Sequence, residues 1–177
     1  MDERPGDAFE LGMVLTVVGR RLEPGTIVPE FSLDALNPAD STIHIVRLAD
    51  SAGKVRLLNV VNSLDTPVCR VETRRWDELR ADLPADVVVY TISMDLPFAQ
   101  GRWQTAESIS HQMLSAHRGE QFGRDYGVLI KEWRLLQRAV FVVGRDDRLA
   151  YAEYVADQMA EPDYTAAVAA ARRAAAS

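Results

Sequence analysis

The sequence predicts an α/β domain, in which a sheet of buried strands lies between layers of helices. Three runs of mostly apolar residues have the length of single strands and lack the polar alternation of a half-exposed strand. They lie at residues 55–61, 86–93 and 138–143. Segments with helical character separate these runs, and this alternation is typical of α/β and mixed three-layer folds.

Smaller elements are expected at the N-terminal end. Residues 9–18 (FELGMVLTVV) are interrupted by Gly12 and predict a small β-hairpin ahead of the main domain, while residues 1–8 are expected to be flexible. Residues 21–29 contain two prolines and a glycine, so they predict a loop. Two short strands and the turn between them follow, at residues 31–33, 42–46 and 37–40.

The rest of the chain supplies the helices and a more exposed strand. An alternating segment at 149–155 predicts that strand, after a turn at 145–148. Helices are predicted at residues 67–83, 97–107, 119–126 and from 163 to the alanine-rich end. Because neither an internal repeat nor a linker interrupts the pattern, residues 1–177 are predicted to form one domain.

Composition and charge argue against several classes of protein. The formal net charge is −6, whereas a nucleic-acid or anionic-membrane surface needs a basic footprint. The N-terminal stretch MDERPGDAFELG is acidic and polar, unlike a signal peptide, and no apolar run has the length of a membrane span. The single cysteine rules out an intrachain disulfide, and the cytoplasm is the expected compartment.

That cysteine, Cys69, lies where a buried strand leads into a helix. Thr66 has the residue type of an N-cap and Pro67 suits the first helical position, so Cys69 is the third residue of the helix. Unpaired amides and the positive end of the helix dipole favour a thiolate there. Thr66 is three residues away, so its hydroxyl can reach the sulfur or a molecule bound to it. The local sequence favours a reactive thiol, with a small buried side chain as the alternative.

Several segments together resemble one family, the bacterial thiol peroxidase branch of the peroxiredoxins. The segments are DTPVC at 65–69, ISMDLPFAQ at 92–100, RAVFVV at 138–143, EPDY at 161–164 and GTIVPEF at 25–31. The resemblance runs from about Phe9 to the C-terminal helix, and residues 93–100 are its most specific part.

This resemblance implies a thioredoxin-like (peroxiredoxin) fold, with a central mixed sheet flanked by helices and an N-terminal β-hairpin. It implies that Cys69 reacts with peroxide, that Thr66 is its hydroxyl partner and that Arg138 lies near the sulfur. Arg138 and the first-turn amides then stabilise the thiolate and the stretched O–O bond. Judged without the family, Arg138 could equally be a strand-end arginine in a surface ion pair, and Thr66 a simple helix cap. The family also implies a homodimer, built partly from residues 93–98.

Two positions depart from the family pattern. The motif has proline four residues before the threonine, where this chain has Asn62, and loss of the proline is expected to reduce the shielding of the cysteine. The resolving cysteine of the family corresponds to Gln104, and the chain has no other cysteine. Intramolecular resolution is therefore excluded, and a peroxidase cycle requires a thiol from outside.

The sequence thus predicts a one-cysteine thiol peroxidase that reduces hydrogen peroxide or small organic hydroperoxides. Its reductant is expected to be an external thiol, either a thioredoxin-like protein or a small molecule. The alternatives are a redox sensor or binding module that signals through oxidation of Cys69, and a remnant with an inert cysteine. No cofactor is expected, since the histidines lack the spacing of metal ligands. His111 and His117 are expected at exposed edges, and Asp95 in a structural role.

Overall fold

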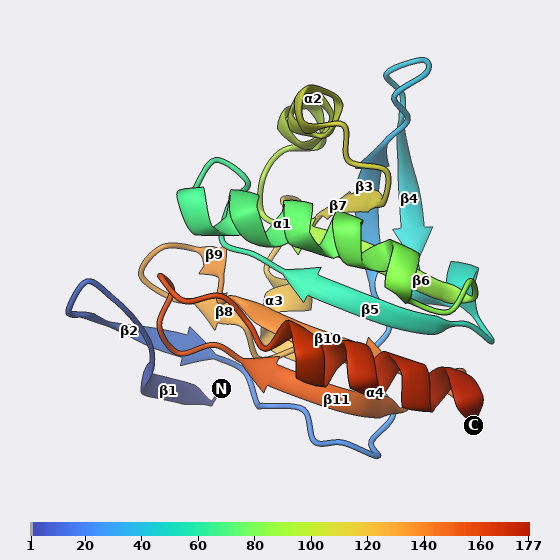
Figure 1. Ribbon diagram of the computed structural model, residues 1–177. Coiled ribbons are helices and arrows are strands. Elements are labelled where there is room, and N and C mark those ends of the chain that lie inside the picture. Colours follow the sequence, from blue (N-terminus) through green and yellow to red (C-terminus); the bar gives the residue numbers. More distant parts are fainter. Residues whose placement is uncertain (1) are drawn as a thin grey trace.

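The computed structural model describes residues 2–177 and confirms the predicted α/β architecture (Figure 1). The central sheet has seven strands in the order β11-β10-β5-β6-β7-β3-β4. The strands are β3 (Ser32–Leu36), β4 (Ile43–Arg47), β5 (Val55–Val60), β6 (Val87–Ser93), β7 (Gln112–Ser115), β10 (Ala139–Val143) and β11 (Leu149–Tyr154). The pairs β5–β6 and β6–β7 are parallel and the other pairs antiparallel, so the sheet is mixed.

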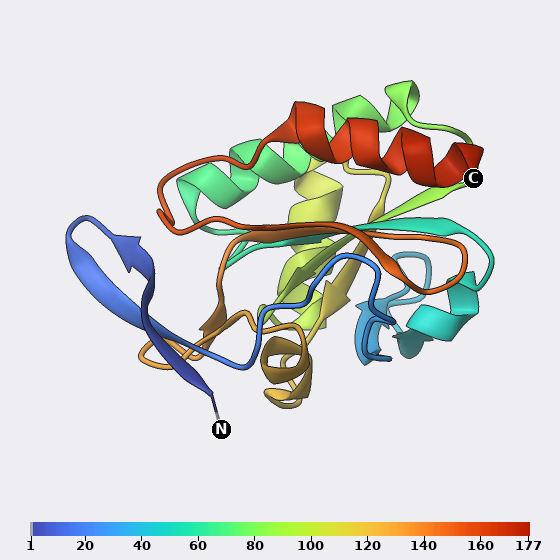
Figure 2. The same ribbon diagram turned by 90° about the horizontal axis from the view of Figure 1, so that it is seen from below.

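Helices cover both faces of this sheet. They are α1 (Pro67–Leu79), α2 (Pro97–Glu107), α3 (Gln121–Asp125) and α4 (Tyr164–Ala176), with short 3₁₀ turns at Leu48–Ser51 and Arg80–Asp82. Helices α1 and α4 lie side by side on one face, and α3 lies on the other (Figures 1 and 2). Trp76 of α1 and Tyr164 of α4 connect the two helices through an edge-to-face ring contact, with 5.0 Å between the ring centroids. Helix α2 packs against β3 and β7.

Strand β5 shows why a central strand has a mostly apolar sequence. Leu57 packs beneath α1 and α4, whereas Leu58 points to the opposite face and packs with Phe31 and Phe122. Successive side chains of a strand point to opposite faces, and here each face lies under another layer. The mostly apolar run in the sequence therefore indicates a central strand.

The N-terminal hairpin belongs to a second, smaller sheet with the order β1-β2-β8-β9. Its strands are β1 (Glu3–Glu10), β2 (Met13–Val18), β8 (Leu129–Ile130) and β9 (Leu135–Leu136). Leu11 and Gly12 both have positive φ, as a two-residue hairpin turn requires, so the predicted break at Gly12 is confirmed. Strand β1 begins at Glu3, which pairs with Val18, so most of the segment that we expected to be flexible is paired with β2 instead.

Other differences from the predicted elements concern short segments. Strands β7, β8 and β9 were not predicted, because segments of two to four residues show no measurable periodicity. Helix α1 ends at Leu79, where a 3₁₀ turn replaces the expected continuation to residue 83. Strand β3 extends to Leu36, beyond the predicted end at residue 33, because it pairs along its length with β4.

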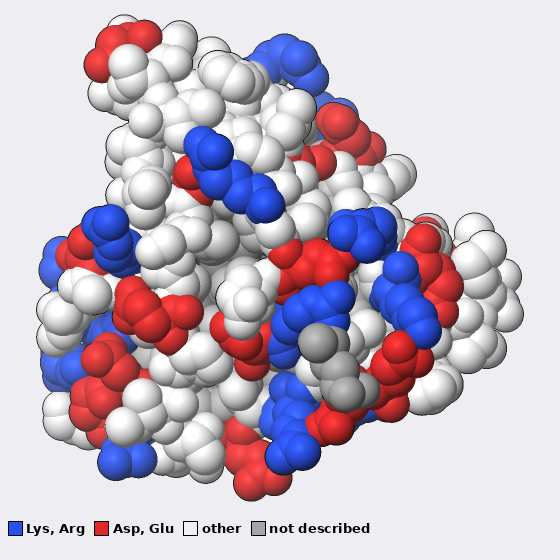
Figure 3. Space-filling view, turned by 180° about the vertical axis from the view of Figure 1, so that it is seen from behind, with Lys and Arg blue, Asp and Glu red and all other residues white. Residues whose placement is uncertain are grey.

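Charged side chains are mixed on the surface. On the face shown in Figure 3, basic and acidic residues are interspersed over the molecule. Ion pairs between surface residues include Lys131–Glu3 at 2.7 Å and Arg21–Asp7 at 3.0 Å. Among residues 2–177, no helix is both long and apolar enough to cross a membrane.

A buried polar network ties α1 to the beginning of β7. His111 is buried and not at an exposed edge as we expected, because its ring is enclosed by two partners. Its Nδ1 lies 2.9 Å from Asp77 Oδ1, and its Nε2 lies 2.8 Å from Thr91 Oγ1. Asn59 Nδ2 donates to the same Thr91 oxygen, which leaves the threonine hydroxyl to donate to Nε2. This arrangement fits a neutral imidazole that donates from Nδ1 to Asp77.

This network predicts a contribution to stability that is lost in acid. Burial lowers the pKa of His111 below its usual 6.5, although Asp77 opposes that shift. The hydrogen bond from His111 lowers the pKa of Asp77 below its usual 3.8. At these two groups the folded state therefore binds fewer protons than the unfolded state, so the stability that they contribute at neutral pH is lost as the pH falls below 6.5.

Chemical unfolding at about pH 7.5 and about pH 5.5, on either side of the usual histidine pKa, measures this effect. We expect the free energy of unfolding that the parent gains over His111→Gln to be smaller at the acid end. The matched variant at the exposed His44, His44→Gln, should keep the pH dependence of the parent. An equal pH dependence in both variants would contradict the assignment.

Candidate active site

The site lies where β5 leads into α1, at the carboxyl end of a parallel strand, where α/β folds place ligands. Asp95 anchors the connecting loop: its Oδ1 accepts from Ser63 Oγ at 2.7 Å, and its Oδ2 accepts from the Leu64 amide at 2.8 Å. Thr66 occupies the N-cap position and Pro67 the first helical position, as the sequence predicts. Cys69 follows as the third helical residue, and it is fully buried.

Arg138 is the principal polar neighbour of the sulfur. It directly precedes β10, and its Nη2 donates to Cys69 Sγ at 3.4 Å. The same nitrogen donates to the Gln158 carbonyl at 2.8 Å. Arg138 is fully buried, so the alternative of a surface ion pair does not hold. The structure thus brings together two site residues that lie 69 positions apart in the chain.

Two residues that the sequence analysis did not consider hold Arg138. Its Nη1 forms an ion pair with the carboxylate of Glu72, which is also fully buried. The backbone amide of Arg138 donates to Gln158 Oε1 at 2.9 Å. Burial raises the pKa of Glu72 to about 8, while the positive charge of Arg138 opposes the shift. Burial also disfavours the charge of Arg138, but Glu72 and Cys69 outweigh this effect and raise the pKa of Arg138.

Thr66 lies beside the site but does not make the bonds that we expected. Its hydroxyl donates to the Ser63 carbonyl at 2.9 Å, and its side chain makes no capping hydrogen bond to the helix. The carbonyl of Ser63 lies within reach because the loop turns back on itself before α1. In the described part of the chain, the hydrogen-bond partners of Cys69 Sγ are Arg138 and Asn62.

An apolar pocket of about 390 Å³ opens beside the first turn of α1. Thr66, Pro67 and Val68 form its wall on the helix side, and Asn62 and Gln158 also line it. The remaining lining residues come from the hairpin and from the segments around β9 and before α4: Glu10, Leu11, Trp133, Leu135 and Met159. Cys69 is not among these lining residues, whereas Asn62 both lines the pocket and contacts the sulfur.

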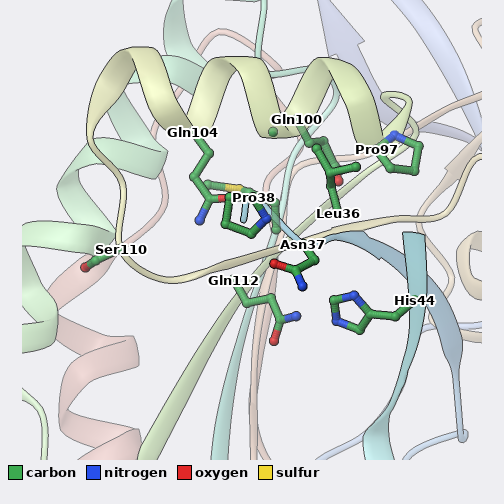
Figure 4. Close-up of a pocket in the computed structure, with 11 residues that line it drawn as sticks. Leu36, Asn37, Pro38, His44, Pro97, Gln100, Gln104, Ser110 and Gln112 are labelled. Atoms are coloured by element: carbon green, nitrogen blue, oxygen red, sulfur yellow. The ribbon is translucent and has the colours of Figure 1, made fainter. Parts of the chain in front are cut away.

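Gln104, the position of the family's resolving cysteine, lies elsewhere. It lines a pocket of about 210 Å³ between α2 and the β3–β4 hairpin (Figure 4). Its Nε2 donates to the His111 carbonyl at 2.9 Å. The preceding residue, Trp103, packs instead against the cluster that contains Cys69. Gln104 therefore lines a different pocket, while its neighbour Trp103 packs on the cluster that contains Cys69.

The sequence analysis did not identify Glu72, Asn62 or Gln158 as neighbours of the site, and the three differ in how far the sequence could have indicated them. Glu72 is three residues after Cys69, and that helical spacing places both side chains on one side of α1. Asn62 drew attention only as a departure from a motif, with no indication that it contacts the sulfur. Gln158 lies in an irregular segment and gave no signal, because its role depends on the path of the chain between β11 and α4.

The sheet, the hairpin and the cysteine at the start of α1 define a thioredoxin-like fold of the peroxiredoxin type. Residues 24–152 match the model of the AhpC/TSA family, and the chain belongs to this family. The resemblance found in the sequence is confirmed at this level.

Several thiol peroxidases are similar to this protein over nearly the whole chain. The thiol peroxidase of Streptococcus sanguinis is 46% identical over 163 residues, covering 92% of this chain and 96% of that protein. The thiol peroxidase of Bacillus subtilis is 43% identical, covering 91% and 93%. Among solved structures, a peroxiredoxin-like protein from Aquifex aeolicus has a TM-score of 0.81 at 32% identity, covering 94% of this chain and 96% of its own.

Proposed function

We propose that this protein is a thiol peroxidase that reduces hydrogen peroxide or small organic hydroperoxides through Cys69 and is recycled by an external thiol. The observation that carries this proposal is the hydrogen bond from the buried Arg138 to Cys69 Sγ at the first turn of α1. Membership of the AhpC/TSA family and the thiol peroxidase relatives support it.

The reaction begins with attack of the Cys69 thiolate on one peroxide oxygen. An S–O bond forms, the O–O bond breaks, and the departing oxygen leaves as water or an alcohol after it gains a proton. The products are a sulfenic acid on Cys69 and the reduced peroxide. Arg138 carries a positive charge beside the reacting atoms, so it stabilises both the thiolate and the negative charge on the departing oxygen.

The second half of the cycle requires a thiol that this chain lacks. An external thiol condenses with the sulfenic acid to a mixed disulfide and water, and a second thiol then releases Cys69. The single cysteine supports this one-cysteine cycle. We infer that the reductant approaches over the pocket beside α1, because Asn62, which contacts the sulfur, also lines this pocket.

We also propose a homodimer that uses residues 93–98, as the family resemblance implies. Leu96 and Phe98 are 56% and 58% exposed at the start of α2. Apolar side chains exposed side by side at this level favour an interface.

Steady-state peroxide consumption with a panel of thiol donors tests the proposed function. The parent protein should turn over many times with at least one donor, and Cys69→Ser should abolish consumption because no other thiol is present. A single oxidation event without turnover would favour the sensor or binding module. If peroxide never adds an oxygen to the parent protein, the cysteine is inert and the peroxidase function is wrong.

A further inference from the structure

Asn62 contacts the reacting sulfur with its amide oxygen. Its Nδ2 donates to the Leu136 carbonyl at 2.6 Å and to Gln158 Oε1 at 3.1 Å. A carbonyl can only accept, so the amide nitrogen must face Leu136. The oxygen of the same amide, Oδ1, therefore faces Cys69 Sγ, at 3.8 Å.

The sulfur thus lies between a donor and an acceptor. Arg138 Nη2 donates to it at 3.4 Å, and this bond favours an anion. Asn62 Oδ1 carries a partial negative charge, so it favours forms of the sulfur group that still hold a proton. An O–H···O bond spans about 2.7 Å, so a distance of 3.8 Å from Sγ to Oδ1 accommodates an oxygen bonded to sulfur that donates to Oδ1 at a bent angle.

We propose that Asn62 accepts a hydrogen bond from the sulfenic acid of Cys69 and protects it until the external thiol arrives, a role that depends on the peroxidase function proposed above. Further oxidation proceeds from the deprotonated sulfenate. That sulfenate attacks a second peroxide, a second S–O bond forms, the O–O bond breaks, and a sulfinate and water or an alcohol result. A hydrogen bond that requires the sulfenic proton opposes the loss of that proton and slows this side reaction.

The side chain suits a chain without a resolving thiol. With Gln104 at the resolving position, the sulfenic acid must wait for a collision with an external thiol. Asn62 is only 5% exposed, so its amide is held in place. Water therefore competes little with the sulfenic acid for a hydrogen bond to the amide oxygen. Proline, the residue of the family motif, has no side-chain acceptor to offer.

Two substitutions test the role of the amide oxygen: Asn62→Val and Asn62→Pro. The measured quantity is the amount of sulfinic acid formed per peroxide turnover, by intact-mass spectrometry at fixed thiol and rising peroxide concentration. Loss of one hydrogen bond predicts about a two- to tenfold rise in this ratio. Asn59→Val is the matched control, because Asn59 is a fully buried asparagine that bonds Thr91 and not Cys69. An unchanged ratio in the Asn62 variants overturns the proposal.

The outcome separates this role from the proposed function. If the parent protein neither consumes peroxide nor gains an oxygen, the peroxidase function fails. If the parent turns over but the ratio does not respond to Asn62, only the role of Asn62 fails.

Infrared spectroscopy of the parent protein covers the case in which both Asn62 variants fail to fold. The chain has a single cysteine, so its S–H stretching band has one source. In the protonated thiol the band should lie at lower frequency than that of a small alkanethiol in an apolar solvent without an acceptor, because the thiol donates to Asn62 Oδ1. A band at the frequency of that unbonded thiol overturns the proposal, since Oδ1 then accepts no hydrogen bond from the side chain of Cys69. Cys69→Ser identifies the band by removing it.

Discussion

Arg138→Lys should slow the reaction of Cys69 with peroxide by about 100-fold, the loss typical of removing one preorganised donor from a charged transition state. The guanidinium bonds Glu72 from Nη1 and the sulfur from Nη2, so it bridges two groups with fixed geometry. A lysine ammonium is a single point on a flexible stem and cannot reproduce that bridge. It keeps a positive charge beside Glu72, so this buried carboxylate retains a partner.

Rapid mixing of the reduced protein with peroxide measures the rate constant of this step. Arg56→Lys is the matched control, because Arg56 is also fully buried and bonds the Gly144 carbonyl at 2.9 Å. Both substitutions should destabilise the protein, because each removes a buried arginine that has several partners. Only Arg138→Lys should lose reactivity. Equal rate constants for Arg138→Lys and the parent would show that the arginine does not act on the sulfur.

Gln104→Cys should change the product of peroxide treatment from a sulfenic acid to an intrachain disulfide. In the parent, the sulfenic acid should persist after a stoichiometric dose and react with a dimedone-type reagent, since no resolving thiol exists. In the variant, the introduced thiol can condense with the sulfenic acid and release water. Mass spectrometry should then show the loss of two hydrogens instead of the gain of one oxygen.

The structure predicts that this closure is slow. A disulfide needs Cα atoms within roughly 7 Å. Gln104 lines a pocket that Cys69 does not line, so we expect α1 and α2 to rearrange locally before the bridge forms. Glu107, at the end of α2, is nearly buried between Arg70 and Arg74 of α1, and these ion pairs hold the two helices together. Adding Glu107→Gln to Gln104→Cys should therefore accelerate the bridge.

A cysteine elsewhere in the same pocket provides the control. Gln112 lines the pocket with Gln104 but lies on β7, a strand inside the central sheet. Gln112→Cys should not form the bridge. A sulfenic acid that accumulates unchanged in Gln104→Cys, even with Glu107→Gln, would mean that the helices do not open or that Gln104 is not the resolving position.

The sequence predicted the long elements and the family well, because their signals are local. The mostly apolar runs of β5, β6 and β10 identify central strands, since each face of the sheet is covered. The motif at 65–69 predicted a cysteine at the third position of a helix, because N-cap and first-turn preferences act within a few residues. Short strands such as β7 were not predicted, because they are defined by the strands with which they pair and not by their own sequence.

Sequence alone therefore determined the family, the position of Cys69 at a helix start and the absence of any second thiol. Only the tertiary structure decided what surrounds the sulfur. Arg138 reaches Cys69 from a distant segment of the chain, and Glu72 is recognisable as a partner only once Arg138 lies beside it. Asn62 is close to Cys69 in sequence, but its amide oxygen faces the sulfur because Leu136 and Gln158 hold its amide nitrogen. The physical reason is the distance along the chain over which each interaction acts. Helix capping and strand burial depend on neighbouring residues, so the local sequence predicts them. A buried charge pair and an oriented amide depend on groups that come together only when the core forms.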